Sequence, residues 1–209
     1  MDTKRSHETS RMSKQETSNV RDSILATGQR IMAGKGYSAV GLNEILTAAG
    51  VPKGSFYHYF GSKDAFGEAM LERYFDAYLA ELDQTLQQPG LTMAQRLMDY
   101  WKLWQASQSF EDCQGKCLAV KLGAEVADLS ESMRLVLRRG TQAIVARLAV
   151  AVAAGVEEGS LAIEGDAAAV AAGLYQLWLG ASVMAKIERT TQPFEMARAS
   201  TRQILRLAS

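Results

Sequence analysis

Two cysteines and two histidines are the side chains best suited to nucleophilic or metal chemistry in this sequence. Cys113 and Cys117 lie close together, whereas His7 and His58 both lie in the first third of the chain. Because no histidine is near the cysteines in sequence, the pattern offers neither a Cys–His pair for catalysis nor a complete ligand set for a metal. We therefore expect no enzyme activity, no metal and no cofactor, and chemistry that is confined to a thiol.

Cys117 has the sequence surroundings of a reactive thiol. The preceding Gly115-Lys116 is typical of a helix start, where the helix dipole favours a thiolate, and Lys121 lies one turn later on the same face. A free thiol with a pKa of about 8.5 is about 3% ionised at pH 7, whereas a pKa of about 6.5 makes it about 75% ionised. We predict such a lowered pKa at Cys117, with a buried, inert cysteine as the alternative. Cys113 is either a resolving thiol or simply exposed.

The elements that must position this thiol are all helical, because apolar residues recur with a helical period and no run alternates like a strand. Asn19 is expected to cap a first helix that stops at Gly34-Lys35-Gly36. Ser62 is expected to cap a long helix that ends before Pro89-Gly90. The fold class is therefore all-α, with about nine helices. The remaining helices are expected over 42–49, 53–60, 92–110, 116–127, 130–156, 166–189 and 194–207.

Charge is distributed unevenly along a chain whose net charge is zero. Residues 1–63 hold nine Lys and Arg and five Asp and Glu, a charge of +4, and the remainder holds 14 and 18, a charge of −4. A basic head on an acidic body suits a protein that places only its head near phosphates. We expect a disordered arm over residues 1–17, a DNA-binding domain over 18–62 and a regulatory and dimerisation domain over 63–209.

The polar N-terminus is not a secretory signal, and two cysteines without one indicate a reducing cytoplasm. One stretch, Ala167 to Ala185, carries no charge and approaches the length that spans a bilayer. It is mostly Ala and Gly and includes Gln176 and Ser182, so burial inside a helical oligomer is the better interpretation. We expect no membrane association.

The residues around Gly50 have the pattern of a helix-turn-helix, in which two short helices follow a supporting helix. Gly50 supplies a turn with positive φ, and Val51 plugs the space between the helices. In the second short helix Phe56 is expected to face inward and Phe60 to belong to the same small core. The opposite side is expected to face the major groove and to contact base edges or phosphates. Its residues are Lys53, Gly54, Ser55 and Tyr57.

Residues 36–63, GYSAVGLNEILTAAGVPKGSFYHYFGSK, resemble the N-terminal signature of the TetR family of transcriptional regulators. The resemblance implies that Tyr59 and Lys63 contact the DNA backbone, and His58 is a further candidate. This chain has Val40-Gly41 where the family often carries a Thr pair. We therefore expect Asn43 to take over the phosphate contact of that helix.

Residues 173–186 form a helix with apolar groups on two opposite faces, so both faces must be buried. The face with small residues suits close contact between helices in a symmetric dimer, and the TetR resemblance likewise implies a four-helix dimer interface. That face comprises Gly173, Leu177, Gly180, Ala181 and Met184. The other face also carries Lys186 and is expected to line an apolar pocket. The predicted pocket residues are Trp101, Trp104, Tyr175, Trp178 and Ser182, with Tyr100 beside them.

The segment around Cys117, GKCLAVKLGAEVADLSESMR, resembles the N-ethylmaleimide-responsive, electrophile-sensing branch of the TetR family. The segments VPKGSFYHYFGSKDAFGEAMLER and LWLGASVMAKIER match that branch as well, so the resemblance covers both predicted domains. It implies that Cys117 is the regulatory cysteine and Lys186 its partner lysine, whose ammonium would stabilise the thiolate. Oxidation to a sulfenic acid could then lead to capture by a nearby nitrogen or thiol.

These observations predict a homodimeric repressor that binds double-stranded operator DNA and is released when a small electrophile or oxidant modifies Cys117. The alternative is a TetR-type repressor induced by an apolar ligand that binds non-covalently in the C-terminal pocket. A third possibility is that the protein activates transcription.

Overall fold

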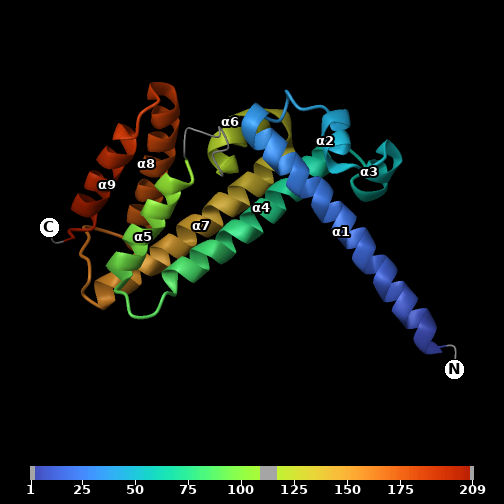
Figure 1. The fold of residues 1–209 in the computed structure, drawn as a ribbon. Coiled ribbons are helices and arrows are strands. Elements are labelled where there is room, and N and C mark those ends of the chain that lie inside the picture. The colour runs from blue at the N-terminus through green and yellow to red at the C-terminus, as the bar shows by residue number, and fades with distance from the viewer. Residues whose placement is uncertain (1–2, 109–116, 208–209) are drawn as a thin grey trace.

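The structure is a computed structural model that describes residues 3–108 and 117–207, with side chains described from Asn19 onward. Within these ranges the chain forms nine α-helices and no strand, which confirms the predicted fold class (Figure 1). Cys113 lies outside the described residues. The helices are α1 (Thr3–Lys35), α2 (Leu42–Ala49), α3 (Lys53–Tyr59), α4 (Lys63–Leu86), α5 (Met93–Ala106), α6 (Leu118–Leu129), α7 (Glu131–Glu157), α8 (Ala167–Glu188) and α9 (Gln192–Ile204).

Helix α1 begins earlier than the sequence predicts. The prediction places a disordered arm over residues 1–17 and the helix start at Asn19, whereas the helix of the structure already begins at Thr3. No Pro or Gly occurs between Thr3 and Thr27, so nothing in the local sequence breaks a helix there. Figure 1 shows this N-terminal part projecting from the rest of the molecule as a single helix.

The local signals at several helix ends behave as predicted. Gly50 ends α2 with a φ of 67°, and its backbone N–H bonds back to the last turn of that helix. Ser62 begins α4 by accepting a hydrogen bond of 3.0 Å from the backbone N–H of Ala65. Gly36 follows α1 with a φ of 91°, and Gly90 has a φ of 76° in the turn after α4. Short polar residues and glycines thus fix these ends.

Helices α4 and α7 run side by side through the middle of the molecule, with α2 and α3 at one end and α8 and α9 at the other (Figure 1). Gly140 permits the close approach of α4 and α7. A Cβ atom at Gly140 would lie only 2.3 Å from the ring of Phe75, which is buried between the two helices. Helix α4 therefore has one face fixed against α7 along the body.

The first turn of α4 also belongs to the core of the head, the unit formed by α1, α2 and α3. The ring of Phe66 lies 5.6 Å from that of Phe56 and 5.1 Å from that of Phe60, between centroids. All three rings are buried, as predicted for Phe56 and Phe60. Because α4 contributes to the cores of both head and body, a tilt of α4 must move the head.

Among the described residues, two helices are long and apolar enough to span a membrane, namely α7 and α8. The sequence analysis identified such a stretch only in α8. Both pack within the helical body, α7 against α4 and α8, and α8 also against α9. Such helices are common as core elements of helical proteins.

Candidate functional site

Cys117 is the N-cap residue of α6 and is only 4% exposed. Its sulfur interacts with the backbone N–H groups of Ala119 and Val120 and with the hydroxyl of Tyr74. The predicted position of Cys117 at a helix start is therefore confirmed. The site combines a helix N-terminus with a phenol, and both can donate a hydrogen bond to a thiolate.

The predicted lowering of the Cys117 pKa is wrong. Burial raises the pKa of the Cys117 thiol, and it outweighs the opposing effects of Val120, Tyr74, Ala119 and the charge of Lys186. The sequence shows the helix start and the lysine, but it does not show that the sulfur is withdrawn from water. Because desolvation disfavours the charged form of any acid, the thiol stays protonated at neutral pH.

The cation that acts on Cys117 is Lys186 of α8. Burial lowers the pKa of the Lys186 ammonium, with Cys117 opposing that shift and the like charge of Lys121 adding to it. Lys121, predicted to help Cys117 directly, thus lies close enough to Lys186 for repulsion. The structure brings together the predicted cysteine and lysine from segments that are far apart in the sequence.

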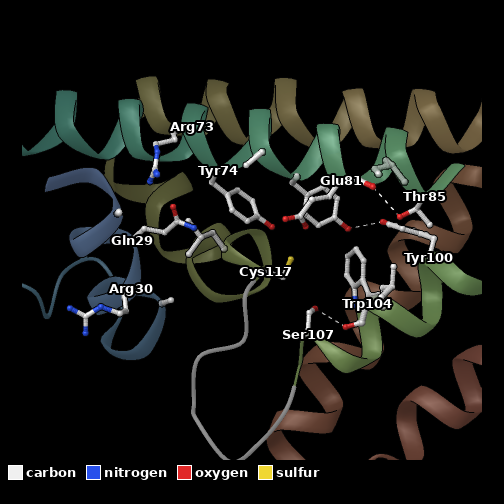
Figure 2. A pocket seen from close by; sticks show the side chains of 17 residues that line it. Gln29, Arg30, Arg73, Tyr74, Glu81, Thr85, Tyr100, Trp104, Ser107 and Cys117 are labelled. Carbon is white, nitrogen blue, oxygen red and sulfur yellow. Dashed lines mark hydrogen bonds between the residues drawn. The ribbon is translucent and has the colours of Figure 1, made fainter. Parts of the chain in front are cut away.

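Beside Cys117 lies a pocket of about 500 Å³ (Figure 2). Aromatic side chains form its inner wall, and Figure 2 shows Cys117 below Tyr74 of α4 with Tyr100 and Trp104 of α5 to one side. Arg30 of α1 lies on the other side. A volume of this order suits a small organic molecule. The lining residues are Ala26, Gln29, Arg30, Ala33, Arg73, Tyr74, Ala77, Tyr78, Glu81, Leu82, Thr85, Tyr100, Leu103, Trp104, Ser107, Cys117 and Leu118.

Of the five predicted pocket residues, only Trp104 lines this pocket. Trp101 and Trp178 stack on each other instead, with ring centroids 4.9 Å apart and planes at 11°. The Trp104 indole donates to the Ser182 hydroxyl over 2.9 Å, in the buried layer between α5 and α8. Tyr175 is buried next to Trp104, with ring centroids 5.7 Å apart. This face of α8 is therefore core, because α5 and α9 cover it.

Tyr74 and Tyr78 of α4 are the aromatic pocket residues that the sequence prediction missed. The Tyr78 and Tyr100 hydroxyls form a hydrogen bond of 2.8 Å, and that of Tyr74 reaches Cys117. A signal was available, because Tyr74, Tyr78, Glu81 and Thr85 recur at helical spacing. They form a more polar stripe beside an apolar one that has the same spacing and consists of Phe75, Leu79, Leu82 and Leu86.

The predicted DNA-contacting side of α3 is exposed. Lys53, Gly54 and His58 are exposed and Tyr57 is 52% exposed, whereas Phe56 on the opposite side is fully buried. Ser55 and Tyr59 are half-buried, and Asn43 of α2 is exposed. The ring of Tyr57 is half exposed in the folded head, so it is available to pack on DNA.

Lys63 has partners inside the protein. Its ammonium donates to the backbone carbonyl of Tyr37 over 2.9 Å and lies 4.4 Å from the centre of the Tyr37 ring. The Tyr37 hydroxyl in turn donates to the Lys63 carbonyl and to the carboxylate of Asp64. The sequence prediction for Lys63 did not include this link between α4 and the loop that follows α1. A phosphate contact at Lys63 would have to use the donors that remain on the ammonium.

Glu125 connects helix α6 to the head. Its carboxylate accepts hydrogen bonds from the backbone N–H groups of Tyr37 and Ser38, at 3.0 Å and 2.7 Å. Burial alone would raise the pKa of the Glu125 carboxyl, but the bonds from Ser38 and Tyr37 and the charge of Lys63 hold that pKa below its ordinary value. The contact is therefore charged at neutral pH. The sequence analysis did not identify it.

The outer face of α8 is apolar and exposed, as a dimer interface requires. Gly173 and Gly180 are exposed with open space above them, and Met184 is 43% exposed. Leu177 is half-buried, whereas Ala181 is buried within this chain and faces inward. The exposed stripe continues over apolar residues that sequence reasoning had not included. They are Val183 and Ile187 on α8 and Met196 and Ile204 on α9.

Comparisons with known proteins match both halves of the chain. Residues 24–70 match the family described as bacterial regulatory proteins, tetR family, and residues 93–201 match the tetracyclin repressor-like C-terminal domain. The HTH-type transcriptional repressor NemR of Escherichia coli is 42% identical over 198 residues, which is 93% of this chain and 98% of NemR. The transcriptional regulator AcuR of Cereibacter sphaeroides is 34% identical, over 85% of this chain and 81% of AcuR. The crystal structure of the reduced form of E. coli NemR superposes with a TM-score of 0.85, covering 90% of this chain and 97% of that one.

The raised pKa predicts how Cys117 reacts with pH. At pH 7 we expect alkylation of Cys117 by N-ethylmaleimide to be slower than that of free cysteine. The rate should still be rising above pH ~8.5, where a free thiol is about half ionised. Replacing Lys186 by Met removes the cation that favours the thiolate, so the rate at pH 7 should fall about two- to fivefold, the effect of a partly exposed charge.

The measurement is labelling followed by mass spectrometry in a Cys113→Ser background, with Lys102→Met of α5 as the matched lysine control. A rate that levels off below pH 7 would contradict the raised pKa. Equal rates for the two lysine variants would contradict the role of Lys186.

Proposed function

The chain belongs to the TetR family of bacterial regulatory proteins, and we propose that it leaves its operator when a reactive electrophile or oxidant modifies Cys117. Members of this family are DNA-binding transcriptional regulators that act as dimers, and the chain is a repressor of this type rather than an enzyme. One observation carries the proposal. Cys117 both lines the pocket and begins α6, the helix whose Glu125 holds the head.

The proposed DNA contacts come from the exposed side of α3. Lys53, Ser55 and Tyr57 read the major groove, and Gly54 lets the backbone approach closely because it has no side chain. Lys53 and Tyr57 project into solvent on the same side of α3, which supports this proposal. Asn43, His58, Tyr59 and Lys63 contact the DNA backbone.

The chemistry that we propose at Cys117 is attack by its sulfur on an electrophile held in the pocket. The thiol gives its proton to water, and the sulfur lone pair forms a bond to the β-carbon of an activated alkene such as a quinone or N-ethylmaleimide. The π bond of that alkene breaks, its electron pair shifts toward the carbonyl, and the product takes up a proton from water. Lys186 favours the thiolate during this step. Burial keeps the resting thiol protonated, and the thiol borders the pocket. The site therefore reacts with molecules that first bind in the pocket, and reactivity in bulk water is suppressed. The solved NemR relative is described in a reduced form, which supports a redox-sensitive group in that protein.

The proposed signal travels along α6. Cys117 is 4% exposed and its sulfur interacts with the backbone N–H groups of Ala119 and Val120, so an adduct that extends into the pocket breaks these contacts and displaces the start of the helix. Glu125 lies eight residues further on, about 12 Å along the axis of a rigid helix. A shift of α6 pulls its carboxylate away from the N–H groups of Tyr37 and Ser38. The head then loses the contact that fixes it to the body, and the two heads of the dimer lose the spacing of adjacent major grooves.

The proposed dimer interface is the exposed apolar stripe of α8 and α9. Gly173 and Gly180 allow a second helix to approach closely, while Met184 and Ile187 supply the apolar contact area. A two-fold arrangement of these helices covers side chains that one chain alone leaves in water. As a DNA-binding regulator, the protein is expected to act in the cytoplasm.

The pocket also supports the second candidate function, in which an apolar ligand binds without a covalent bond. Its volume of about 500 Å³ exceeds what one small electrophile fills, and Arg30 places a residue of the head helix α1 in its wall. A ligand that contacts both α1 and α4 could change their packing directly. Replacement of Cys117 separates this mechanism from the covalent one.

Operator binding by the head can be tested by substitution in α3. We expect the Lys53→Ala, Tyr57→Ala double variant to lose specific operator binding, because it removes a base or phosphate donor and the exposed ring. The loss should be about 30-fold or more, from about 1–3 kcal/mol for each of the two contacts. Gel-shift titration with operator DNA at fixed salt measures it, with Lys102→Ala on the body as a control for loss of one charge. Retained specific binding would show that α3 does not read the operator as proposed.

The role of the Cys117 thiol can be tested by adding an electrophile. Adding a quinone or N-ethylmaleimide should weaken operator binding of the wild-type protein about 5- to 150-fold, the range of a coupling free energy of 1–3 kcal/mol. The Cys117→Ser variant should bind DNA normally and lose this response, whereas Cys113→Ser should keep it. Fluorescence anisotropy of labelled operator measures both. Normal release of Cys117→Ser would favour the non-covalent ligand instead.

Transmission of the signal from Cys117 to the head can be tested at Glu125. The Glu125→Ala variant lacks the acceptor for Tyr37 and Ser38, so its reduced form should already bind the operator more weakly. Modification of Cys117 should then add little, and the wild-type response should shrink to about twofold or less. Glu131→Ala is the matched control, because Glu131 pairs with Arg134 within α7. A full response in Glu125→Ala would rule out this route, whatever the outcome for Cys117.

A further inference from the structure

Tyr175 of α8 has a buried hydroxyl without a hydrogen-bond partner. The residue is only 3% exposed, so bulk water does not reach the hydroxyl. The neighbouring phenols are paired: Tyr74 with Cys117, and Tyr78 with Tyr100 over 2.8 Å. An unsatisfied buried donor is destabilising and rare in folded proteins, so this one calls for a physical explanation.

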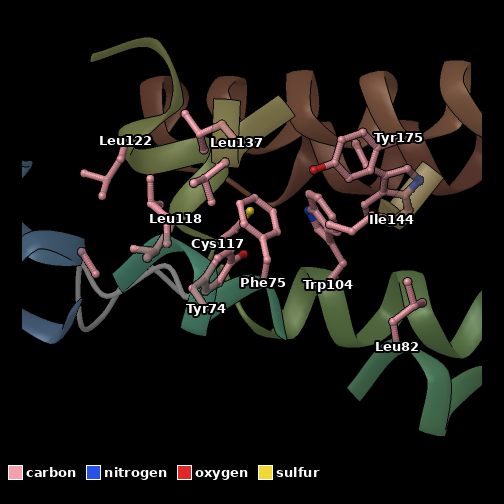
Figure 3. Close-up of a cluster of buried hydrophobic side chains, with 14 of the residues drawn as sticks. Tyr74, Phe75, Leu82, Trp104, Cys117, Leu118, Leu122, Leu137, Ile144 and Tyr175 are labelled. Carbon is pink, nitrogen blue, oxygen red and sulfur yellow. The ribbon is translucent and has the colours of Figure 1, made fainter. Parts of the chain in front are cut away.

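The Tyr175 hydroxyl points toward Cys117. Figure 3 shows the oxygen of Tyr175 on the side of its ring that faces the sulfur of Cys117. The two groups also interact electrostatically, because a charge on Cys117 raises the pKa of Tyr175 further after burial has raised it. The phenol therefore stays protonated and keeps its proton available for donation.

The reduced sulfur does not need this donor. It already interacts with the N–H groups of Val120 and Ala119 and with the Tyr74 hydroxyl. A thiol sulfur is a weak acceptor, and three donors are ample for it. The free donor at Tyr175 is thus matched to an acceptor that the reduced protein lacks. Oxidation of the thiol supplies one, because it adds a single oxygen atom to the sulfur.

We propose that the Tyr175 hydroxyl binds the oxygen of a sulfenic acid formed at Cys117, so that the phenols around the sulfur stabilise this oxidation state. The proposal rests on the proposed reactivity of Cys117, and the oxidant is a hydroperoxide. The thiolate sulfur attacks the terminal oxygen, the O–O bond breaks, and an S–O bond forms. The sulfur gives up two electrons, and the alkoxide that leaves takes the proton that the thiol released. The products are one sulfenic acid and one alcohol.

Tyr175 has two roles in this proposal. Its hydrogen bond holds the sulfenic oxygen in one direction, which satisfies that oxygen in a site where water does not reach it. The buried, hydrogen-bonded oxygen also slows a second oxidation to the sulfinic acid, a step that is irreversible for most proteins. The sensor thiol therefore remains recoverable by reduction.

The test compares Tyr175→Phe with Tyr100→Phe, both in the full chain with Cys113→Ser. Tyr100→Phe is the matched control, because it removes a phenol hydroxyl of the same cluster that has an internal partner in Tyr78. Each protein is treated with cumene hydroperoxide, the excess is removed, and the sulfenic acid is followed over time. Trapping with dimedone and intact mass report the sulfenic acid, and the gain of a second oxygen reports overoxidation. Thermal melting of the reduced proteins is measured in parallel.

We expect the sulfenic acid of Tyr175→Phe to decay at least about fivefold faster than that of the parent, the factor that corresponds to about 1 kcal/mol. Reduced Tyr175→Phe should melt at or above the parent temperature, since its lost hydroxyl had no partner. Tyr100→Phe should change the lifetime by less than about twofold and melt lower. An unchanged lifetime for Tyr175→Phe would overturn the proposal, and so would a lower melting temperature of its reduced form, because the hydroxyl would then have a partner already.

These results are independent of DNA release, so they separate this inference from the proposed function. If Cys117→Ser still leaves DNA on treatment while Tyr175→Phe shortens the sulfenic lifetime, the signalling role fails and the stabilising role of Tyr175 stands. If the parent forms no trappable sulfenic acid, the stabilising role fails, whereas release by N-ethylmaleimide still decides the proposed function.

Discussion

The carboxylate of Glu125 accepts two backbone N–H groups from the loop between α1 and α2, and one of these partners lies 88 residues away in the sequence. This contact makes α6 part of two units at once. Its first residue borders the pocket, and its middle holds the head. Hydrogen bonds to an ionised acceptor are stronger than neutral ones, and a helix transmits a displacement along its axis. A displacement of α6 along its axis would therefore move the acceptor of the Tyr37 and Ser38 N–H groups.

Burial and reactivity oppose each other at Cys117. Withdrawal from water raises the pKa of the thiol, while the helix start, Tyr74 and Lys186 favour the thiolate. Burial has the larger effect, so the resting state is a protonated thiol. In the proposed function the same burial lets modification act as a signal, because an exposed thiol could accept an adduct without moving the backbone. A buried thiol whose sulfur contacts the first N–H groups of a helix cannot.

Much of the local structure follows from the sequence. Gly50, Ser62 and the Pro89-Gly90 pair mark helix ends because their backbone preferences and hydrogen bonds act over a few residues. The exposed side of α3 and the outer face of α8 follow from helical periodicity in the same way. The early start of α1 shows the limit of this reasoning, since a polar sequence without Pro or Gly is compatible with a helix as well as with disorder.

The sequence by itself determined the helical fold class, the reading head, and the two residues Cys117 and Lys186 that meet at the candidate sensor site. Only the tertiary structure decided which faces are covered. Trp178 belongs to the core rather than to the pocket because Trp101 stacks on it, and Tyr74 belongs to the pocket because α4 passes over Cys117. Local rules act within a few turns of one helix, whereas burial depends on which other helix lies opposite. The pKa of Cys117 and the contact of Glu125 with the head are both consequences of that packing, and neither has a local signature in the sequence.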